Sequence, residues 1–253
     1  MEAYLDNSAT TRVDAQVQEL MKKLMDVDFG NPSSRHQKGV VAEGYIKEAR
    51  QKIAATLKVD PKELIITSGG TESNNMALIG TALAAKRKGN HIITTAVEHP
   101  SVKATASFLE EQGFRITFLS VDSRGQISLE DLKEALTPDT ILVSIMYVNN
   151  EIGTIQPVEE AAKLVHATVP GAVFHVDAIQ AYGKVMIRPK QQGIDLLSVS
   201  SHKFHGPKGA GFLYCSSKVN LHPIIFGGGQ QSGMRSGCLL YTSPSPRDRS
   251  VSR

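Results

Sequence analysis

Lys203 is the first residue whose setting suggests chemistry. It follows the apolar run IDLLSVS and lies in the small, polar segment SVSSHKFHGPKG rather than in a charged helix. A partly desolvated amine has a lowered pKa and can form a Schiff base with an aldehyde. Ser200 and His202 come from the same segment and could contact a phosphate. Because most lysines are simply solvated, this interpretation depends on partners elsewhere in the chain.

Asp177 ends the apolar run AVFHVD, where a carboxylate is costly to desolvate without a cationic or hydrogen-bonding partner. A pyridinium nitrogen would be such a partner, because the carboxylate keeps it protonated and the ring can then accept electrons. Gln180 follows closely and could hydrogen-bond a ring substituent such as a phenolic oxygen. The alternative is an aspartate that only caps a turn, and for Asp177 taken alone that alternative is favoured.

The segment SGGTES joins an apolar run to a helix-favouring stretch, so its backbone N–H groups could hold a phosphate. The alternative is a glycine-rich turn in which Thr71 or Ser73 caps the helix. His99 follows the run HIITTA and could stack on a cofactor and move protons, although a lone histidine before a proline more often only starts a helix. Asn149 and Asn150 end another run and could add a polar contact.

The elements that must position these residues alternate between two kinds. Strand-length apolar runs occur at ELIITS, HIITTA, FRITFLS, TILVSIMYV, AVFHVD, IDLLSVS and GAGFLY. Helices are expected at 14–25, 35–57, 71–87, 101–112, 128–136 and 158–167. This alternation predicts an α/β fold with a mainly parallel sheet flanked by helices. Ligands of such sheets collect at the carboxyl ends of the strands, where the residues above are found.

Composition excludes several other classes. The 253 residues are 41% hydrophobic and 21% charged, which is typical of a soluble globular protein. The formal net charge of +3 owes +2 to the last sixteen residues, so no basic face for nucleic acid is expected. No run is long enough to cross a membrane and the start lacks a signal-peptide pattern, so a cytoplasmic location is expected. Zinc and dinucleotide sites are disfavoured, because ligand spacing and a G-x-G-x-x-G motif are missing.

Eight segments in order carry a resemblance to a known family: DNSATT, FGNPSSRHQKG, TSGGTESNN, TTAVEHPSV, VNNEIGTIQP, HVDAIQ, SSHKFHGPKG and GMRSG. They resemble the cysteine desulfurases of the class V aminotransferase group, over about residues 3–237. The resemblance implies the aspartate-aminotransferase-like fold (fold type I), pyridoxal 5′-phosphate as cofactor, a homodimer and conversion of L-cysteine to L-alanine. It also implies a sulfur-acceptor or iron-sulfur scaffold protein as partner.

The same resemblance implies roles for matching positions. Lys203 would hold the cofactor covalently, and His99 would stack on it and act as an acid and base. Asp177 would contact the ring nitrogen and Gln180 the phenolic oxygen. The phosphate would be held by Gly70, Thr71, Ser200 and His202, with Asn150 near cofactor and substrate. No metal is implied.

The match is expected to stop after GMRSG, where Cys238 stands in place of the family's threonine. Residues 1–237 are therefore expected to form the large domain with its amino-terminal segment, and 238–253 a disordered, non-native tail. The smaller domain, with the sulfur-carrying cysteine, would be mostly absent. Two alternatives stay open: another class V activity, such as selenocysteine lyase or an aminotransferase, and a non-catalytic fragment that binds the cofactor.

Overall fold

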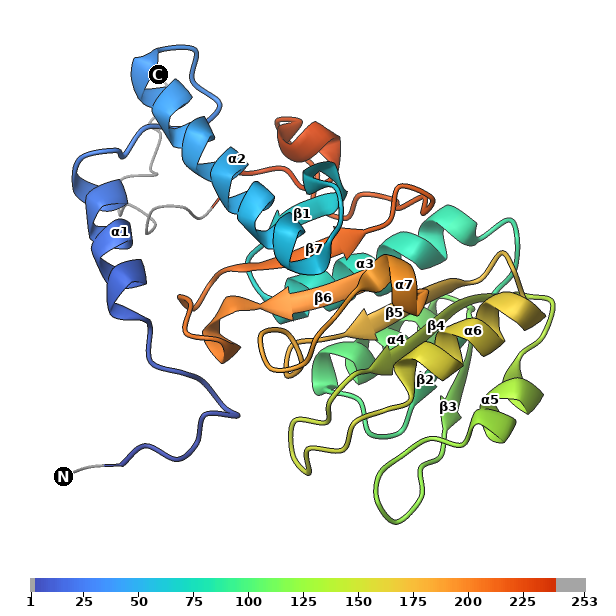
Figure 1. Cartoon of the computed structure of the whole chain (residues 1–253). Coiled ribbons are helices and arrows are strands. Elements are labelled where there is room, and N and C mark those ends of the chain that lie inside the picture. Colours follow the sequence, from blue (N-terminus) through green and yellow to red (C-terminus); the bar gives the residue numbers. More distant parts are fainter. Residues whose placement is uncertain (1–2, 240–253) are drawn as a thin grey trace.

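A computed structural model describes residues 3–239, and a seven-stranded sheet forms its centre (Figure 1). The strand order is β1-β7-β6-β5-β4-β2-β3. The four pairs from β6 to β3 are parallel, whereas β7 pairs antiparallel with both β6 and β1. The mainly parallel sheet predicted from the sequence is therefore confirmed.

All seven predicted apolar runs form strands, within one or two residues of the expected ends. The strands are β1 (Leu64–Thr67), β2 (His91–Thr95), β3 (Arg115–Leu119), β4 (Thr140–Met146), β5 (Val173–Asp177), β6 (Leu196–Ser200) and β7 (Gly211–Cys215). The main helices are α1 (Ala15–Asp26), α2 (Gln37–Leu57), α3 (Gly70–Ala85), α4 (Pro100–Glu111), α5 (Leu129–Ala135) and α6 (Val158–Thr168). The sequence did not predict the short α7 (Pro189–Gln192), because one helical turn leaves no periodic pattern.

Helices cover both faces of the sheet, which explains why strands such as β4 are buried along their whole length. On one face α3 and α4 pack around Met76, Leu78 and Leu109. On the other face α5 and α6 pack around Leu132 and Val165. Packing on both faces thus fixes the strands, and it also fixes the residues at their carboxyl ends.

In the amino-terminal part, helices α1 and α2 extend away from this core (Figure 1). Figure 1 shows α1 and α2 projecting from the sheet, and residues 3–14 running along the molecule without helix or strand. The expected tail, 238–253, lies outside the described residues from position 240 onward. In the described part of the chain, no helix is long and apolar enough to cross a membrane. Between residues 3 and 239, no group of three or more His, Cys, Asp or Glu side chains could hold a metal ion.

Candidate active site

A cavity of about 430 Å³ lies at the carboxyl ends of the parallel strands β4, β5 and β6. The structure brings together in its lining all nine residues that the sequence singled out: Gly70, Thr71, His99, Asn150, Asp177, Gln180, Ser200, His202 and Lys203. Five further residues line it: Ser8, Ala9, Met146, Val148 and Ile179. Residues up to 195 positions apart therefore share one concave surface.

Asp177 is the most deeply set charged group of this cavity, with 4% of its surface exposed. Its Oδ1 accepts a hydrogen bond from the Ile179 N–H at 3.0 Å, and its Oδ2 accepts one from Asn74 Nδ2 at 2.8 Å. The turn-capping contact considered for Asp177 is thus present, but it uses only one carboxylate oxygen. Burial raises the pKa of Asp177, although these two hydrogen bonds oppose the rise. A cation in the cavity would stabilise the charged form.

Asn74 links Asp177 to His99 through a buried serine. Asn74 Nδ2 also donates to Ser101 Oγ at 2.9 Å, and Ser101 Oγ lies 2.8 Å from His99 Nδ1. The Ser101 backbone N–H donates to the same His99 nitrogen at 3.1 Å. Because a backbone N–H can only donate, His99 Nδ1 is an acceptor and the proton of the neutral ring lies on Nε2.

His99 also starts α4 as its N-cap, so the simpler interpretation of this histidine is correct as well. One side chain therefore performs both tasks: its Nδ1 caps the helix and its ring lines the cavity. Capping fixes the ring orientation, which a proton-transferring histidine requires.

Glu98 is a second buried carboxyl group beside this network, with 2% of its surface exposed. Its Oε1 accepts from the Met146 N–H at 2.8 Å and from Thr95 Oγ1 at 2.9 Å. Met146 is the register partner of Asp177 between β4 and β5, so the two acids are held against neighbouring strand ends. Burial, and then the charge of Asp177, raise the pKa of Glu98 to about 8. Glu98 is therefore protonated at neutral pH, whereas Asp177 has the hydrogen bonds that favour a carboxylate.

Lys203 reaches the cavity from the turn that follows β6, and backbone carbonyls of the amino-terminal segment hold it. Its Nζ donates to Ser8 O at 2.6 Å and to Ala9 O at 2.8 Å. Burial and the nearby Lys184 lower the pKa of Lys203, which makes the neutral amine more accessible. Gln180 Nε2 donates to the same Ser8 carbonyl at 2.8 Å.

The amino-terminal segment is fastened to the lysine turn at a second point. The Thr11 N–H donates to His202 O at 2.8 Å, and Thr11 Oγ1 donates to the same oxygen at 3.0 Å. Thr11 Oγ1 in turn accepts from the His205 N–H at 2.7 Å. Residues 8–11 therefore form part of the site although they belong to no helix or strand.

The amino terminus of α3 provides the anion-binding part of the cavity. The helix begins at Gly70, its N-cap Gly69 has φ 144° and ψ −171°, and no side chain caps it. Such a conformation is essentially restricted to glycine. The alternative in which Thr71 or Ser73 caps α3 is wrong, because both residues lie within the helix. Its first N–H groups are left without a side-chain cap, as an anion site requires.

Sequence reasoning missed the supporting groups. Asn74 lies four residues after Gly70, which places both on one face of α3, so helical spacing offered a signal for it. Ser101 had a weaker signal in its position just after His99. The Ser8 and Ala9 carbonyls had none, because backbone contacts over such a sequence separation leave no mark in side-chain pattern.

These groups fit pyridoxal 5′-phosphate. Among residues 3–239 Asp177 forms no ion pair, and its pKa stays raised despite its two hydrogen bonds, so a protonated ring nitrogen would supply the positive charge that favours the buried carboxylate. The uncapped start of α3 suits a phosphate, and an amine of lowered pKa lines the same cavity. The cavity thus offers Asp177 for the ring nitrogen, the start of α3 for the phosphate and the Lys203 amine for the aldehyde.

Comparison with known proteins gives relatives of this kind. The chain is 49% identical over 236 residues to cysteine desulfurase IscS of Dictyoglomus turgidum, covering 93% of this chain and 59% of the relative. It is 50% identical over 234 residues to putative cysteine desulfurase IscS 1 of Bacillus subtilis, covering 92% of this chain and 61% of the relative. The chain therefore spans about three fifths of the length of these relatives.

Solved structures agree with the fold. A NifS-like protein superposes with a TM-score of 0.93 at 43% identity, over 95% of this chain and 66% of that one. A structure of SspA in complex with cysteine superposes with a TM-score of 0.90 at 40% identity, over 94% of this chain and 68% of that one. The expected fold type I large domain is confirmed by these neighbours.

The family model described as aminotransferase class-V matches residues 3–245, eight residues beyond the point at which the resemblance was expected to stop. The match covers nearly the whole chain and agrees with the relatives, the superposed structures and the cavity. The chain therefore belongs to the class V aminotransferase family, whose enzymes use pyridoxal 5′-phosphate.

Proposed function

We propose that this chain binds pyridoxal 5′-phosphate in the cavity and carries the cofactor-dependent chemistry of a cysteine desulfurase. The reaction converts L-cysteine to L-alanine. The sulfur atom of the cysteine passes to an acceptor thiol, which becomes a persulfide. The observation that carries the proposal is the convergence of Asp177, Lys203 and the uncapped start of α3 on one cavity. Relatives named cysteine desulfurases support the choice of substrate.

The residues that would hold the cofactor follow from their chemistry. Asp177 would face the ring nitrogen, and Gln180 the phenolic oxygen. Bound there, the cofactor would supply an electron-accepting ring that stabilises negative charge on substrate atoms. The phosphate would be held by Gly70, Thr71, Ser200 and His202, with Asn150 beside cofactor and substrate.

His99 would stack on the ring and move protons at Nε2, since its Nδ1 is committed to Ser101. Asn74 would keep the orientation of both His99 and Asp177, because its amide nitrogen donates toward each side of the network. A shared buried donor makes the two groups respond to one another. Proton transfer at His99 and charge at Asp177 are therefore coupled in this proposal.

Lys203 would hold the cofactor through its aldehyde group and would transfer protons near the substrate. Its lowered pKa favours both tasks, because each needs the neutral amine for part of the cycle. Ser8 and Ala9 would orient the amine through their carbonyl groups.

Cys215 is not proposed as the sulfur acceptor. It lines a different cavity, and burial raises the pKa of its thiol to about 12, which suppresses the reactive thiolate. Cys238 matches no family cysteine in motif or place. These are the two cysteines of the sequence, so the acceptor thiol is proposed to lie outside residues 1–253, and a sulfur-acceptor or iron-sulfur scaffold protein would receive the sulfur in turn.

A second copy of the chain is a proposed partner. Large apolar side chains are exposed in the amino-terminal part, among them Leu5 (88%), Phe29 (60%) and Val40 (56%). Apolar surface of this kind is typical of an interface.

The large domain at 1–237, the non-native tail at 238–253 and the cytoplasmic location remain parts of this proposal.

Titration with pyridoxal 5′-phosphate, followed by absorption spectroscopy, tests the function. The wild-type chain should bind one equivalent, and Asp177→Asn should weaken binding by about tenfold or more, because it removes a charge-assisted contact. Lys163→Ala, which breaks a surface pair on α6, is the control and should bind normally. A wild-type chain that does not bind the cofactor would contradict the proposal.

Product analysis separates the neighbouring activities. After addition of L-cysteine and a thiol acceptor, the desulfurase function predicts alanine and persulfide in equal amounts. Exchange of the amino group would favour an aminotransferase, and turnover of selenocysteine alone would favour a selenocysteine lyase. Binding without any product would favour the non-catalytic alternative.

A further inference from the structure

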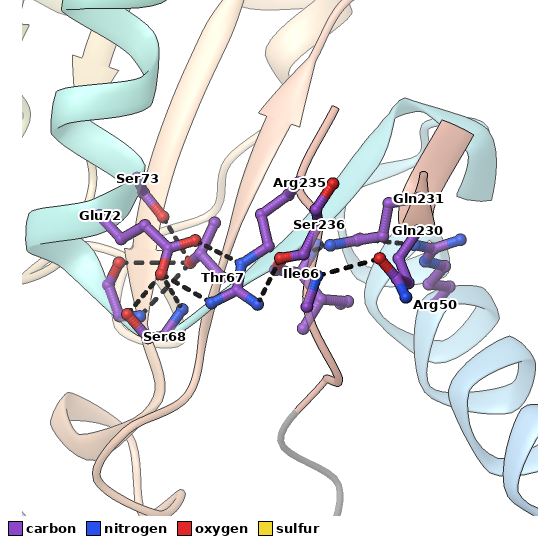
Figure 2. A network of polar contacts seen from close by, with 12 residues as sticks. Arg50, Ile66, Thr67, Ser68, Glu72, Ser73, Gln230, Gln231, Arg235 and Ser236 are labelled. Atoms are coloured by element: carbon purple, nitrogen blue, oxygen red, sulfur yellow. Dashed lines mark hydrogen bonds and ion pairs between the residues drawn. The ribbon is translucent and has the colours of Figure 1, made fainter. Parts of the chain in front are cut away.

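The last described segment of the chain, residues 230–237, lies against β1 and the start of α3 (Figure 2). Gln231 pairs with the Ile66 backbone at the edge of the sheet: its Nε2 donates to the carbonyl and its Oε1 accepts from the N–H, both at 2.8 Å. Arg50 Nη2 donates to the same Gln231 oxygen at 2.6 Å. The segment is thereby fixed beside the turn that leads into α3.

Arg235 extends from this segment to Glu72 in the first turn of α3, as Figure 2 shows. Arg235 Nε lies 2.8 Å from Oε1, and Nη2 lies 3.1 Å from Oε2, so the pair is bidentate. The two side chains are only 16% and 11% exposed. Bidentate pairs with little solvent are among the stronger and more directional polar contacts.

Glu72 also accepts hydrogen bonds from the turn before α3. Its Oε2 accepts from the Ser68 N–H at 3.0 Å and from Ser68 Oγ at 2.5 Å. Burial raises the pKa of Glu72, but the hydrogen bonds from Arg235 and Ser68 outweigh it, so the pKa lies below its ordinary value. Glu72 is therefore a carboxylate that holds the Ser68–Gly70 turn in shape.

This carboxylate stands next to the part of the site that suits an anion. Glu72, together with Gly70, Thr71 and Ser200, lines a second cavity of about 400 Å³, and these last three residues also line the first cavity. A negative charge in the first turn stabilises the helix itself but repels a phosphate bound at the same place. The charge of Arg235 removes that repulsion while the carboxylate keeps its hold on the turn.

We propose that Glu72 and Arg235 act as a pair of positioning residues for the cofactor's phosphate group. Glu72 shapes the turn that precedes α3, and Arg235 compensates its charge from the far end of the described chain. The inference rests on the proposed function, because it assigns these residues to the phosphate of the same cofactor.

The test compares pyridoxal 5′-phosphate with pyridoxal, which lacks the phosphate, in equilibrium binding to the chain. Arg235→Met should weaken binding of the phosphorylated compound about tenfold more than that of pyridoxal, because a low-exposure carboxylate loses its partner. Arg235→Lys should recover part of the difference. Glu72→Gln combined with Arg235→Met should recover more than half of it, since the repelling charge is gone and an acceptor for Ser68 remains.

Arg115→Met is the matched control, because it breaks an arginine ion pair that is about half exposed and lies at β3. It should change neither affinity. Equal losses for both compounds in Arg235→Met, or a double variant no better than the single one, would overturn the proposal.

Amide hydrogen exchange without any cofactor tests the role of the Glu72–Arg235 pair independently of the proposed function. Arg235→Met should speed exchange at Ser68 and Gly69 relative to wild type and to Arg115→Met. A wild-type chain that binds neither compound would refute the proposed function. Unchanged exchange at Ser68 would refute the role of the pair in shaping the turn.

Discussion

The cavity has two walls of different construction. The inner wall, formed by Asp177 and His99 with Asn74 behind them, comes from a strand end and from helices of the core. The outer wall, formed by Lys203 and His202 with residues 8–11, depends on hydrogen bonds to a segment without helix or strand. Packing orders the inner wall before any ligand arrives. In the outer wall, residues 8–11 are held by those few long-range contacts, so a substitution there should lower cofactor affinity with little loss of stability.

Asn74→Ala should have the largest effect on stability, because it removes the donor that Asp177 and Ser101 share in the inner wall. Asn74 is fully buried and donates to both Asp177 and Ser101. The free energy of unfolding should fall by about 2–3 kcal/mol, from lost hydrogen bonds and a new cavity. Chemical denaturation measures the loss.

Asn75→Ala is the matched control on the next position of α3, where the side chain only donates to the Thr71 carbonyl. Its loss should stay at about 0.5 kcal/mol or less. Equal losses for the two variants would contradict the special role of the inner wall.

Glu98→Gln should change the pH dependence of stability. The pKa of Glu98 is raised from 4.5 to about 8, so the folded chain keeps a proton that the unfolded chain releases. The unfolding free energy of the wild type should therefore decrease as the pH rises through this range. Glutamine mimics the protonated acid, so the variant should lack most of that decrease.

Denaturation at about pH 5 and about pH 9 measures this difference, with the exposed Glu111→Gln as control. Parallel pH profiles for wild type and Glu98→Gln would show that Glu98 is ionised in the fold.

Thr11→Val tests the outer wall with the smallest effect on stability. The substitution removes the hydroxyl that bridges His202 and His205, at an expected cost of about 1 kcal/mol. Cofactor affinity should fall by several-fold, because residues 8–11, which orient Lys203, are held less firmly against the lysine turn. Ser8→Ala is the control, since Ser8 contacts the lysine only through its carbonyl. A Thr11→Val chain with unchanged affinity would remove residues 8–11 from the site.

Local pattern explains what the sequence could predict in both walls. Strand-length apolar runs place Asp177, of the inner wall, and Lys203, of the outer wall, at the ends of neighbouring strands. The nine predicted site residues meet for that reason. The contacts of Ser8 and Ala9 depend on the path of the backbone, and the Glu72–Arg235 pair joins positions 163 apart. Neither leaves a periodic or compositional signal.

Capping of α3 was another point that local reasoning left open. Thr71 is a residue type that often caps helices. However, α3 begins one residue earlier, at Gly70, and its N-cap is Gly69 with φ 144°. The positive φ requires glycine at position 69, and the backbone of β7 approaches this turn so closely that a Cβ on Gly211 would lie 2.7 Å from Gly69 Cα. This constraint comes from β7 and is invisible in the segment SGGTES.

Borohydride reduction of the chain with pyridoxal 5′-phosphate, followed by peptide mapping, tests the central claim most directly. The reduced cofactor should be attached to Lys203, and Lys203→Ala should carry no label, while Lys184→Ala and Lys208→Ala remain labelled at Lys203. Label on another lysine, or on none in the wild-type chain, would contradict the assignment of this cavity.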